Sequence, residues 1–204
     1  MKKRIAVFGG SFDPITDAHL KIMAEIIHAQ MADEVWVIPC GPRQDKKLVA
    51  SPLDRLMMCH LAVDSSFGSR FPIKVKEIEI FEKKAIPTYL LLQRLEKEKP
   101  DFSFKFVIGA DLIPQLQNWY EGKKLWQEFN FLVIPRPGYE KGKLPKNFTW
   151  LETPNLQLAH TQLSSTETRK RLSKDFSLVD GLIPPAVLAH IIRYRLYSQN
   201  ESNR

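Results

Sequence analysis

The sequence predicts an α/β protein built on a doubly wound parallel sheet. Short runs of apolar and β-branched residues, typical of buried strands, alternate with segments that repeat apolar residues at helical spacing. This alternation continues along nearly all of the 204 residues. A chain of this length can bury an adequate core without disulfides or metals, so we expect one domain over residues 1–204.

The first half of the chain contains three predicted strands and two predicted helices. Leu20, Met23 and Ile27 recur at helical spacing after the first strand, and Pro52 is well placed to open the second helix. The segment from Val75 to Ile80 alternates apolar and charged residues, which indicates a half-exposed strand. The predicted strands are residues 4–8, 34–39 and 73–81, and the predicted helices are residues 17–30 and 52–63.

The second half of the chain continues the alternation and ends in helices. The predicted strands are residues 102–108 and 129–134 with a short one near Leu151, and the predicted helices are residues 87–99, a segment after Asp111, 164–174 and 185–197. This order indicates a Rossmann-like doubly wound sheet with a C-terminal helical part over roughly 164–198. Sheets of this kind bind ligands outside the carboxyl ends of their strands, so we expect the binding residues in the loops there.

The composition suits a cytosolic protein with an anionic partner. The formal net charge is +7, but the basic residues come in small groups rather than in one long tract. No apolar run approaches the roughly 18 residues of a membrane span, and the N-terminal one is too short for a signal peptide. Cys40 and Cys59 are too few for a disulfide framework and too distant for a CxxC site, so we expect two buried thiols.

The loop after the first strand carries the most unusual residues. Gly9 and Gly10 let the backbone approach a ligand, and the helix that follows offers free N–H groups to an anion. Thr16 and His19 lie three residues apart in its first turn, where both could donate to a phosphate. The spacing matches neither the dinucleotide fingerprint GxGxxG nor the P-loop GxxxxGK[ST], so those two kinds of nucleotide site are excluded.

This loop, GGSFDPITDAH, resembles the signature of the nucleotidyltransferases that carry a (His/Thr)-x-Gly-His motif. Thr16 and His19 occupy the motif positions, and Ala18 stands where glycine is usual. The resemblance implies that Thr16 and His19 bind the phosphates of ATP. The implied ATP-binding residues of the loop are Phe8, Gly9, Gly10, Ser11, Phe12 and His19.

A second signature begins at Ser164. Ser164 and Glu167 form the pattern of a capping box, in which each side chain bonds the other residue's backbone. The same segment resembles the family's Ser-Ser-Thr-x-x-Arg motif. Ser165, Thr166 and Arg169 would then hold the ATP phosphates, with Arg169 neutralising charge on the leaving pyrophosphate.

The middle of the chain resembles one branch of this superfamily, the nicotinate or nicotinamide mononucleotide adenylyltransferases. Gly109-Ala110-Asp111 with Trp119 matches their Gly-Ala-Asp…Trp segment, which implies that Gly109 and Asp111 bind ATP, with Asp111 on ribose hydroxyls, and that Trp119 stacks on the pyridine ring. Leu90 replaces an aspartate that is usual near that pocket. The residues implied to bind the mononucleotide are Ser11, Thr88, Trp119 and Arg136.

The implied reaction joins ATP and a mononucleotide to give a dinucleotide and pyrophosphate. The attacking phosphate has a second pKa near ~6, so it needs no protein base at neutral pH. His19, Lys46 and Arg169 would supply positive charge, although Lys47 matches the family's lysine almost as well as Lys46. We expect Mg²⁺ to arrive with ATP, because no side-chain cluster in the sequence has metal-ligand spacing.

Two other functions remain open from the sequence. A phosphopantetheine adenylyltransferase shares the Asp-Pro-Ile-Thr version of the first motif, but not the segment that ends in Trp119. A basic nucleic-acid-binding module would show a continuous basic stripe or exposed aromatic residues, and neither is evident, so we expect no nucleic acid and no membrane as partner. Between the two pyridine substrates, we expect nicotinate mononucleotide to react at least as well as the amide.

Overall fold

The computed structural model describes residues 2–139, 142, 144–153 and 164–198. In this part of the chain, six parallel strands form one sheet in the order β3-β2-β1-β4-β5-β6. The strands are β1 (Lys3–Gly10), β2 (Glu34–Pro39), β3 (Ile73–Val75), β4 (Phe102–Gly109), β5 (Asn130–Ile134) and β6 (Phe148–Trp150). The predicted doubly wound parallel α/β fold is therefore confirmed.

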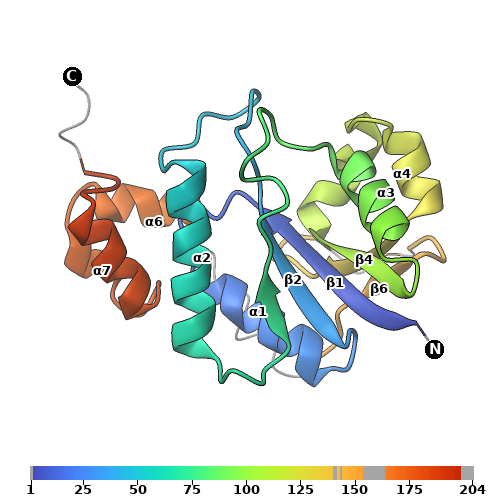
Figure 1. Cartoon of the computed structure of the whole chain (residues 1–204), viewed down its shortest axis with the longest axis horizontal. Coiled ribbons are helices and arrows are strands. Elements are labelled where there is room, and N and C mark those ends of the chain that lie inside the picture. The colour runs from blue at the N-terminus through green and yellow to red at the C-terminus, as the bar shows by residue number, and fades with distance from the viewer. Residues whose placement is uncertain (1, 140–141, 143, 154–163, 199–204) are drawn as a thin grey trace.

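Helices cover both faces of the sheet (Figure 1). The α-helices are α1 (Asp17–His28), α2 (Pro52–Ser66), α3 (Thr88–Glu98), α4 (Gly122–Glu128), α6 (Ser165–Leu172) and α7 (Pro185–Arg193), and the 3₁₀ helices are η1 (Ala110–Asn118) and η2 (Phe176–Val179). α1 and α2 lie on one face with α6 and α7 beside them, whereas α3 and α4 lie on the other.

The two faces bury separate apolar cores, and the alternation of β1 shows how. Ala6 points into the core that α1, α2 and α7 cover, with Met23 and Val187. Its neighbours Ile5 and Val7 point the opposite way, into the core under α3 and α4. Strands buried on both faces are apolar along their whole length, which is why the strand patterns were readable in the sequence.

The predicted strand over residues 73–81 is wrong beyond Val75. The chain turns there, with the Ile80 N–H donating to the Glu77 carbonyl at 3.2 Å. The carboxylate of Glu79 is buried and accepts from the backbone N–H groups of Gly41 and Ile86. Residues 76–81 alternate like a strand but form a loop, in which the Glu79 carboxylate turns inward to accept these two hydrogen bonds.

Three further expectations about local structure need adjustment. The segment after Gly109 is a 3₁₀ helix rather than an α-helix, and the last helix ends at Arg193. Of the two cysteines, Cys59 is buried as expected, but Cys40 is half-buried at the end of β2. Within the described residues, no helix is long and apolar enough to cross a lipid bilayer.

The order of the strands locates the crevice in which ligands of such folds bind. β1 and β4 are neighbours at the centre of the sheet, and the chain continues outward in opposite directions on their two sides. Their carboxyl ends, Gly10 and Gly109, therefore lie at the switch point of the sheet. The loop that follows β1 carries the first signature, and the loop that follows β4 carries the Gly109-Ala110-Asp111 segment.

Candidate active site

The loop after β1 is shaped by its own phenylalanine. Phe12 has a positive φ of 46°, which folds its buried ring back over Gly10. A Cβ on Gly10 would lie 3.0 Å from that ring, so the glycine is needed for packing as well as for approach to a ligand. The ring also meets the imidazole of His19 edge-on, with centroids 5.3 Å apart. Phe12 thus orients His19.

The hydrogen bonds of His19 define which of its nitrogens carries the proton. The backbone N–H of Thr16 donates to Nδ1 of His19 at 3.0 Å, so Nδ1 is an acceptor and the proton sits on Nε2. Burial, together with the nearby Arg136, lowers the pKa of His19 to about 4. His19 is therefore a neutral hydrogen-bond donor at neutral pH, and the expectation that it supplies positive charge needs correction.

Thr16 contacts Nδ1 of His19 with both its backbone N–H and its hydroxyl. The Thr16 side chain is 0% exposed, and its hydroxyl lies 2.8 Å from Nδ1 of His19. Direct donation from Thr16 to a phosphate does not fit this burial. The pair forms a capping box at the start of α1, with histidine at the position where glutamate is usual.

The second signature begins α6 and lies against the first loop. Ser164 caps the helix by accepting from the Glu167 N–H at 3.2 Å, as expected. The Glu167 carboxylate pairs with Arg171 instead of returning to Ser164, so the capping box is only half formed. The Ser165 hydroxyl donates to the carbonyl of Pro14 at 2.9 Å, which ties α6 to the loop after β1.

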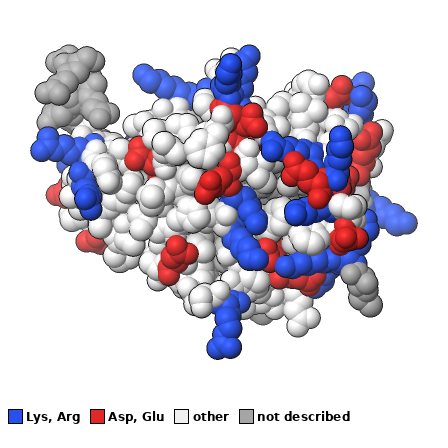
Figure 2. Space-filling view, viewed as in Figure 1, with Lys and Arg blue, Asp and Glu red and all other residues white. Residues whose placement is uncertain are grey.

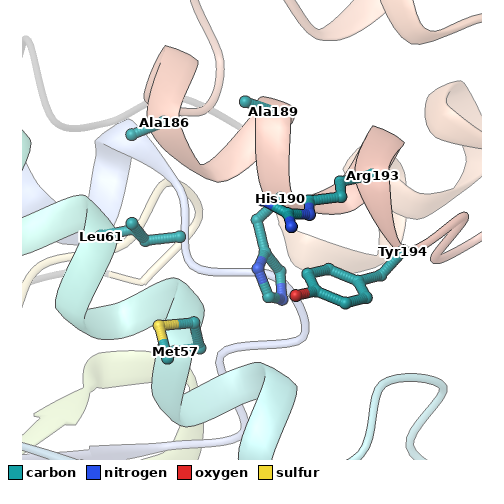
Figure 3. Close-up of a pocket in the computed structure, with 7 residues that line it drawn as sticks. All are labelled: Met57, Leu61, Ala186, Ala189, His190, Arg193 and Tyr194. Atoms are coloured by element: carbon teal, nitrogen blue, oxygen red, sulfur yellow. The ribbon is translucent and has the colours of Figure 1, made fainter.

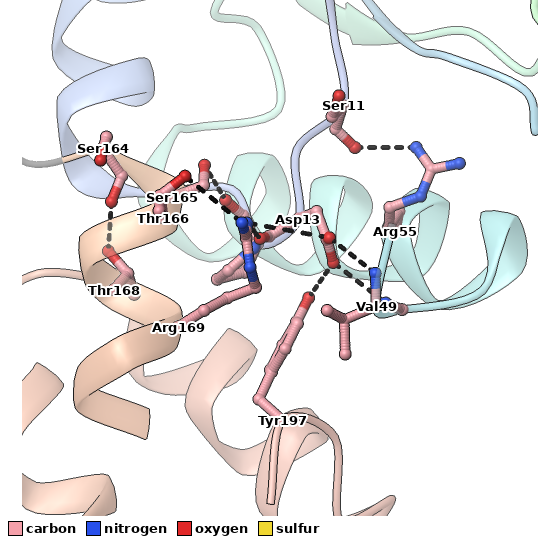
Figure 4. A network of polar contacts seen from close by, with 12 residues as sticks. Ser11, Asp13, Val49, Arg55, Ser164, Ser165, Thr166, Thr168, Arg169 and Tyr197 are labelled. Carbon is pink, nitrogen blue, oxygen red and sulfur yellow. Dashed lines mark hydrogen bonds and ion pairs between the residues drawn. The ribbon is translucent and has the colours of Figure 1, made fainter. Parts of the chain in front are cut away.

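Arg169 reaches from α6 to the first loop. Its Nη1 donates to the backbone carbonyl of Asp13 at 2.6 Å and lies 3.8 Å from the Asp13 carboxylate (Figure 4). Its Nη2 donates to the exposed Thr166 hydroxyl at 3.3 Å. The two signature motifs, more than 140 residues apart in the sequence, therefore meet as the resemblance implied.

The carboxyl ends of β4 and β5 contribute Asp111 and Arg136. The Arg136 Nε lies 3.5 Å from Asp111 Oδ1, and among the residues that the structure describes neither of these two buried atoms has a hydrogen-bond partner. Gly109 makes room for the pair, since a Cβ there would clash with Asp111 Oδ1. Each side chain therefore has an atom that could bond a ligand. The positive charge of Arg136 also lowers the pKa of His19.

The other residues implied to bind the mononucleotide surround this edge of the sheet. Thr88 is the first residue of α3 and is half-buried. Trp119 follows η1, is half-buried, and meets Phe106 edge-on with centroids 6.5 Å apart. The indole is thus packed against the core in part and is not fully buried. Ser11 is half-buried in the first loop.

The loop between β2 and α2 carries the candidate lysines. Lys46 and Lys47 are both exposed there, so the structure favours neither of them. The base of the loop is fixed by Arg55, which is fully buried on α2. Its guanidinium donates to the carbonyls of Ser11 at 2.7 Å and Cys40 at 2.6 Å, joining the ends of β1 and β2.

Figure 2 shows lysine and arginine interspersed with aspartate and glutamate on the face that it displays, rather than a continuous basic stripe. A shallow apolar pocket lies between α2 and α7, away from the switch point (Figure 3). It is lined by Met57, Leu61, Ala186, Ala189, His190, Arg193 and Tyr194. Within the described residues, no group of three His, Cys, Asp or Glu side chains could hold a metal ion.

Comparison with known proteins agrees with this geometry. The profile of the cytidylyltransferase-like family matches residues 7–171, which include both signature motifs. A probable nicotinate-nucleotide adenylyltransferase of Chromobacterium violaceum is 35% identical over 218 aligned positions, covering 97% of this chain and all of the relative. One from Bacillus cytotoxicus is 32% identical over 197 positions, covering 96% of this chain and 98% of the relative.

The chain belongs to the nicotinate-nucleotide adenylyltransferase family. Nicotinic acid mononucleotide adenylyltransferase of Plasmodium falciparum, solved in complex with NaAD, superposes with a TM-score of 0.82 at 33% identity. The match covers 96% of this chain and 97% of the Plasmodium chain. A structure of the same parasite enzyme complexed with APC matches with a TM-score of 0.79 at 31% identity over the same shares. The protein is thus a nucleotidyltransferase with the fold of this family.

Some residues that support the site were not predicted from the sequence. Arg55 is the clearest, and a signal for it existed. It occupies the apolar face of its helix, three, four and seven residues before the buried Met58, Cys59 and Ala62. A buried arginine needs acceptors for its guanidinium, and the two Nη atoms of Arg55 find them in carbonyls at the ends of β1 and β2, which points to a structural role there.

Proposed function

We propose that this protein transfers the adenylyl group of ATP to nicotinate mononucleotide in NAD biosynthesis. A phosphate oxygen of the mononucleotide attacks the α-phosphorus of ATP, and the bond from that phosphorus to the bridging oxygen of the β-phosphate breaks. The products are the dinucleotide and pyrophosphate. Because the attacking phosphate is mostly dianionic at neutral pH, the chain needs to position two anions and to screen their repulsion, without a general base.

The ATP phosphates are assigned to the space between α1 and α6. His19 donates from Nε2, since Nδ1 is occupied by the Thr16 N–H. Ser165, Thr166 and Arg169 contribute from α6, and Arg169 carries the charge that offsets the leaving pyrophosphate. Lys46, or Lys47 in its place, covers the phosphates from the loop after β2.

The mononucleotide is assigned to the neighbouring edge of the sheet, beyond β4 and β5. Trp119 offers the accessible part of its ring to the pyridine, and Thr88 and Ser11 provide hydroxyls near it. Asp111 binds ribose hydroxyls with Oδ1, which accepts no hydrogen bond from the described residues, and Arg136 binds the phosphate of the mononucleotide. This arrangement places the two substrates on the two sides of the switch point.

Three further features belong to the proposal. Mg²⁺ enters as part of the substrate MgATP, in which it bridges phosphate oxygens, rather than as a resident ion. The sheet and the C-terminal helices act as one domain over residues 1–204, because α6 completes the site that begins at β1. The enzyme works in the cytosol, where ATP is supplied.

One observation carries this proposal: the neutral donor His19 lies at the switch point of the sheet, where Arg169 bonds the same loop and the charge of Arg136 lowers the pKa of His19. The test measures pyrophosphate release from MgATP with nicotinate mononucleotide, nicotinamide mononucleotide or phosphopantetheine as acceptor. We expect nicotinate mononucleotide to give a kcat/KM at least equal to that of the amide. A tenfold preference for the amide, about 1.4 kcal/mol, would overturn the choice of acceptor and leave adenylyl transfer intact. Turnover with phosphopantetheine alone would overturn the pyridine assignment.

A further inference from the structure

A single buried carboxylate joins three distant segments of the chain. Asp13, in the loop after β1, is 1% exposed. Its Oδ2 accepts from the Val49 N–H at 2.9 Å, and its Oδ1 accepts from the Ala50 N–H at 3.0 Å. Oδ1 also accepts from the hydroxyl of Tyr197 at 2.8 Å, across 184 residues of sequence (Figure 4). The carboxylate is therefore held both by the loop between β2 and α2 and by the C-terminal part of the chain.

Two of the segments that meet Asp13 carry residues assigned to the ATP phosphates. Val49 and Ala50 end the loop that carries Lys46. Arg169 donates to the backbone carbonyl of Asp13, and its guanidinium lies 3.8 Å from the carboxylate. A shift of the Asp13 side chain would thus displace the lysine loop and the arginine at once.

Tyr197 is built for this contact rather than for simple packing. The residue lies beyond α7 and adopts a φ of 65°, in the left-handed region that a tyrosine rarely occupies. Its side chain is 6% exposed, and burial beside the Asp13 charge strongly raises the pKa of its hydroxyl. The hydroxyl therefore keeps its proton at neutral pH and is a donor there.

Tyr194 provides a useful contrast. It lies three residues earlier, is 54% exposed, and lines the apolar pocket between α2 and α7 instead of reaching the first loop. A tyrosine whose only role was to cover apolar surface would not need its hydroxyl. The buried hydrogen bond to a carboxylate distinguishes Tyr197.

We propose that Tyr197 is a positioning residue for adenylyl transfer. Its hydroxyl holds the Asp13 carboxylate in place, and Asp13 in turn fixes Arg169 and the loop over residues 40–50 around the ATP phosphates. This inference rests on the proposed function for its catalytic readout. It adds a role for the C-terminal part of the chain that lies outside the two signature motifs.

The substitution Tyr197→Phe removes only the hydroxyl and tests the proposal directly. A hydrogen bond to a charged group supports roughly a tenfold effect, so we expect KM for MgATP to rise about tenfold. KM for the mononucleotide should stay within about twofold, because Trp119 and Arg136 lie on other elements. Tyr194→Phe is the matched control and should leave both KM values unchanged.

A double-mutant cycle separates positioning from packing. If Tyr197 acts through Asp13 on Arg169, Tyr197→Phe should weaken MgATP binding much less in an Arg169→Ala background than in the native chain. Additive effects, or an unchanged KM for MgATP in Tyr197→Phe, would overturn the proposal. If Tyr197→Phe is too unstable to assay, Asp13→Asn, which keeps the size of the side chain and removes its charge, must show the same selective rise in KM for MgATP.

Calorimetric titration of each variant with MgATP alone keeps this inference separate from the choice of acceptor. The wild-type protein should bind MgATP about tenfold more tightly than Tyr197→Phe, whichever mononucleotide proves to be the substrate. Equal affinities would refute the positioning role. Absence of pyrophosphate release by a wild-type protein that binds MgATP would instead refute the proposed reaction.

Discussion

Replacing His19 by asparagine tests the neutral donor at the centre of the site. The asparagine side chain can place an acceptor close to the position of Nδ1, where it can still receive the Thr16 N–H that now donates at 3.0 Å. It is too short to place a donor where Nε2 lies. We therefore expect His19→Asn to keep most of the folding stability while kcat falls by ~10²–10³, the usual loss when one preorganised donor to a developing charge is removed.

His19→Ala provides the comparison. Alanine removes the donor and also leaves the buried Thr16 N–H without its acceptor, which costs about 1–3 kcal/mol of folding free energy. Pyrophosphate release gives kcat for both variants, and urea unfolding gives their stabilities. His28→Asn, at the exposed end of the same helix, controls for the substitution itself. An asparagine variant that turns over within a few-fold of the wild type would refute the role of Nε2, and one as unstable as the alanine variant would refute the cap.

Three other outcomes follow from the geometry. The pKa of His19 is about 4 in the folded protein, below the usual 6.5, so the unfolded chain binds a proton first as the pH falls. The free energy of unfolding should therefore be unaffected by His19 above pH 6.5 and should decrease as the pH falls from 6.5 towards 4. Urea titrations should show a smaller decrease for His19→Asn. Trp119→Ala should raise KM for the mononucleotide, leave KM for MgATP within about twofold, and cost less than the ~3–5 kcal/mol of a core tryptophan; a larger loss of stability without a change in KM would assign the ring to the core. Arg55→Met should lower the free energy of unfolding by about 2–5 kcal/mol, because the carbonyls of Ser11 and Cys40 lose their donors, and a neutral result in the same assay would contradict that.

The sequence was most informative where a residue's role depends on its near neighbours. The strands around Ala6 and Phe106 are buried on both faces, so their apolar runs indicated parallel strands directly. Ser164 was predictable as a cap because capping is completed within one turn. The loop from Gly9 to His19 and the helix from Ser164 were identified by the same kind of local pattern.

Roles that depend on distant partners could not be predicted. Glu79 alternates like a strand residue, but its carboxylate turns inward to reach Gly41, 38 residues away. Thr16 was expected to face a phosphate, and only the structure shows its hydroxyl behind His19. The lowered pKa of His19 likewise depends on burial and on Arg136, which follows a strand more than 100 residues later. Such long-range contacts have no local signature.

The central place of β1 has a consequence for how the protein is made. β1 pairs with β2 on one side, but its other partner is β4, where Lys3 lies beside Phe102. During synthesis, one backbone edge of this strongly apolar first strand stays unpaired until about half of the chain has followed. An exposed edge of that kind invites pairing with other chains, and non-local pairing of parallel strands is slow. Newly made chains of this enzyme therefore pass through a stage at which a chaperone has an evident surface to protect.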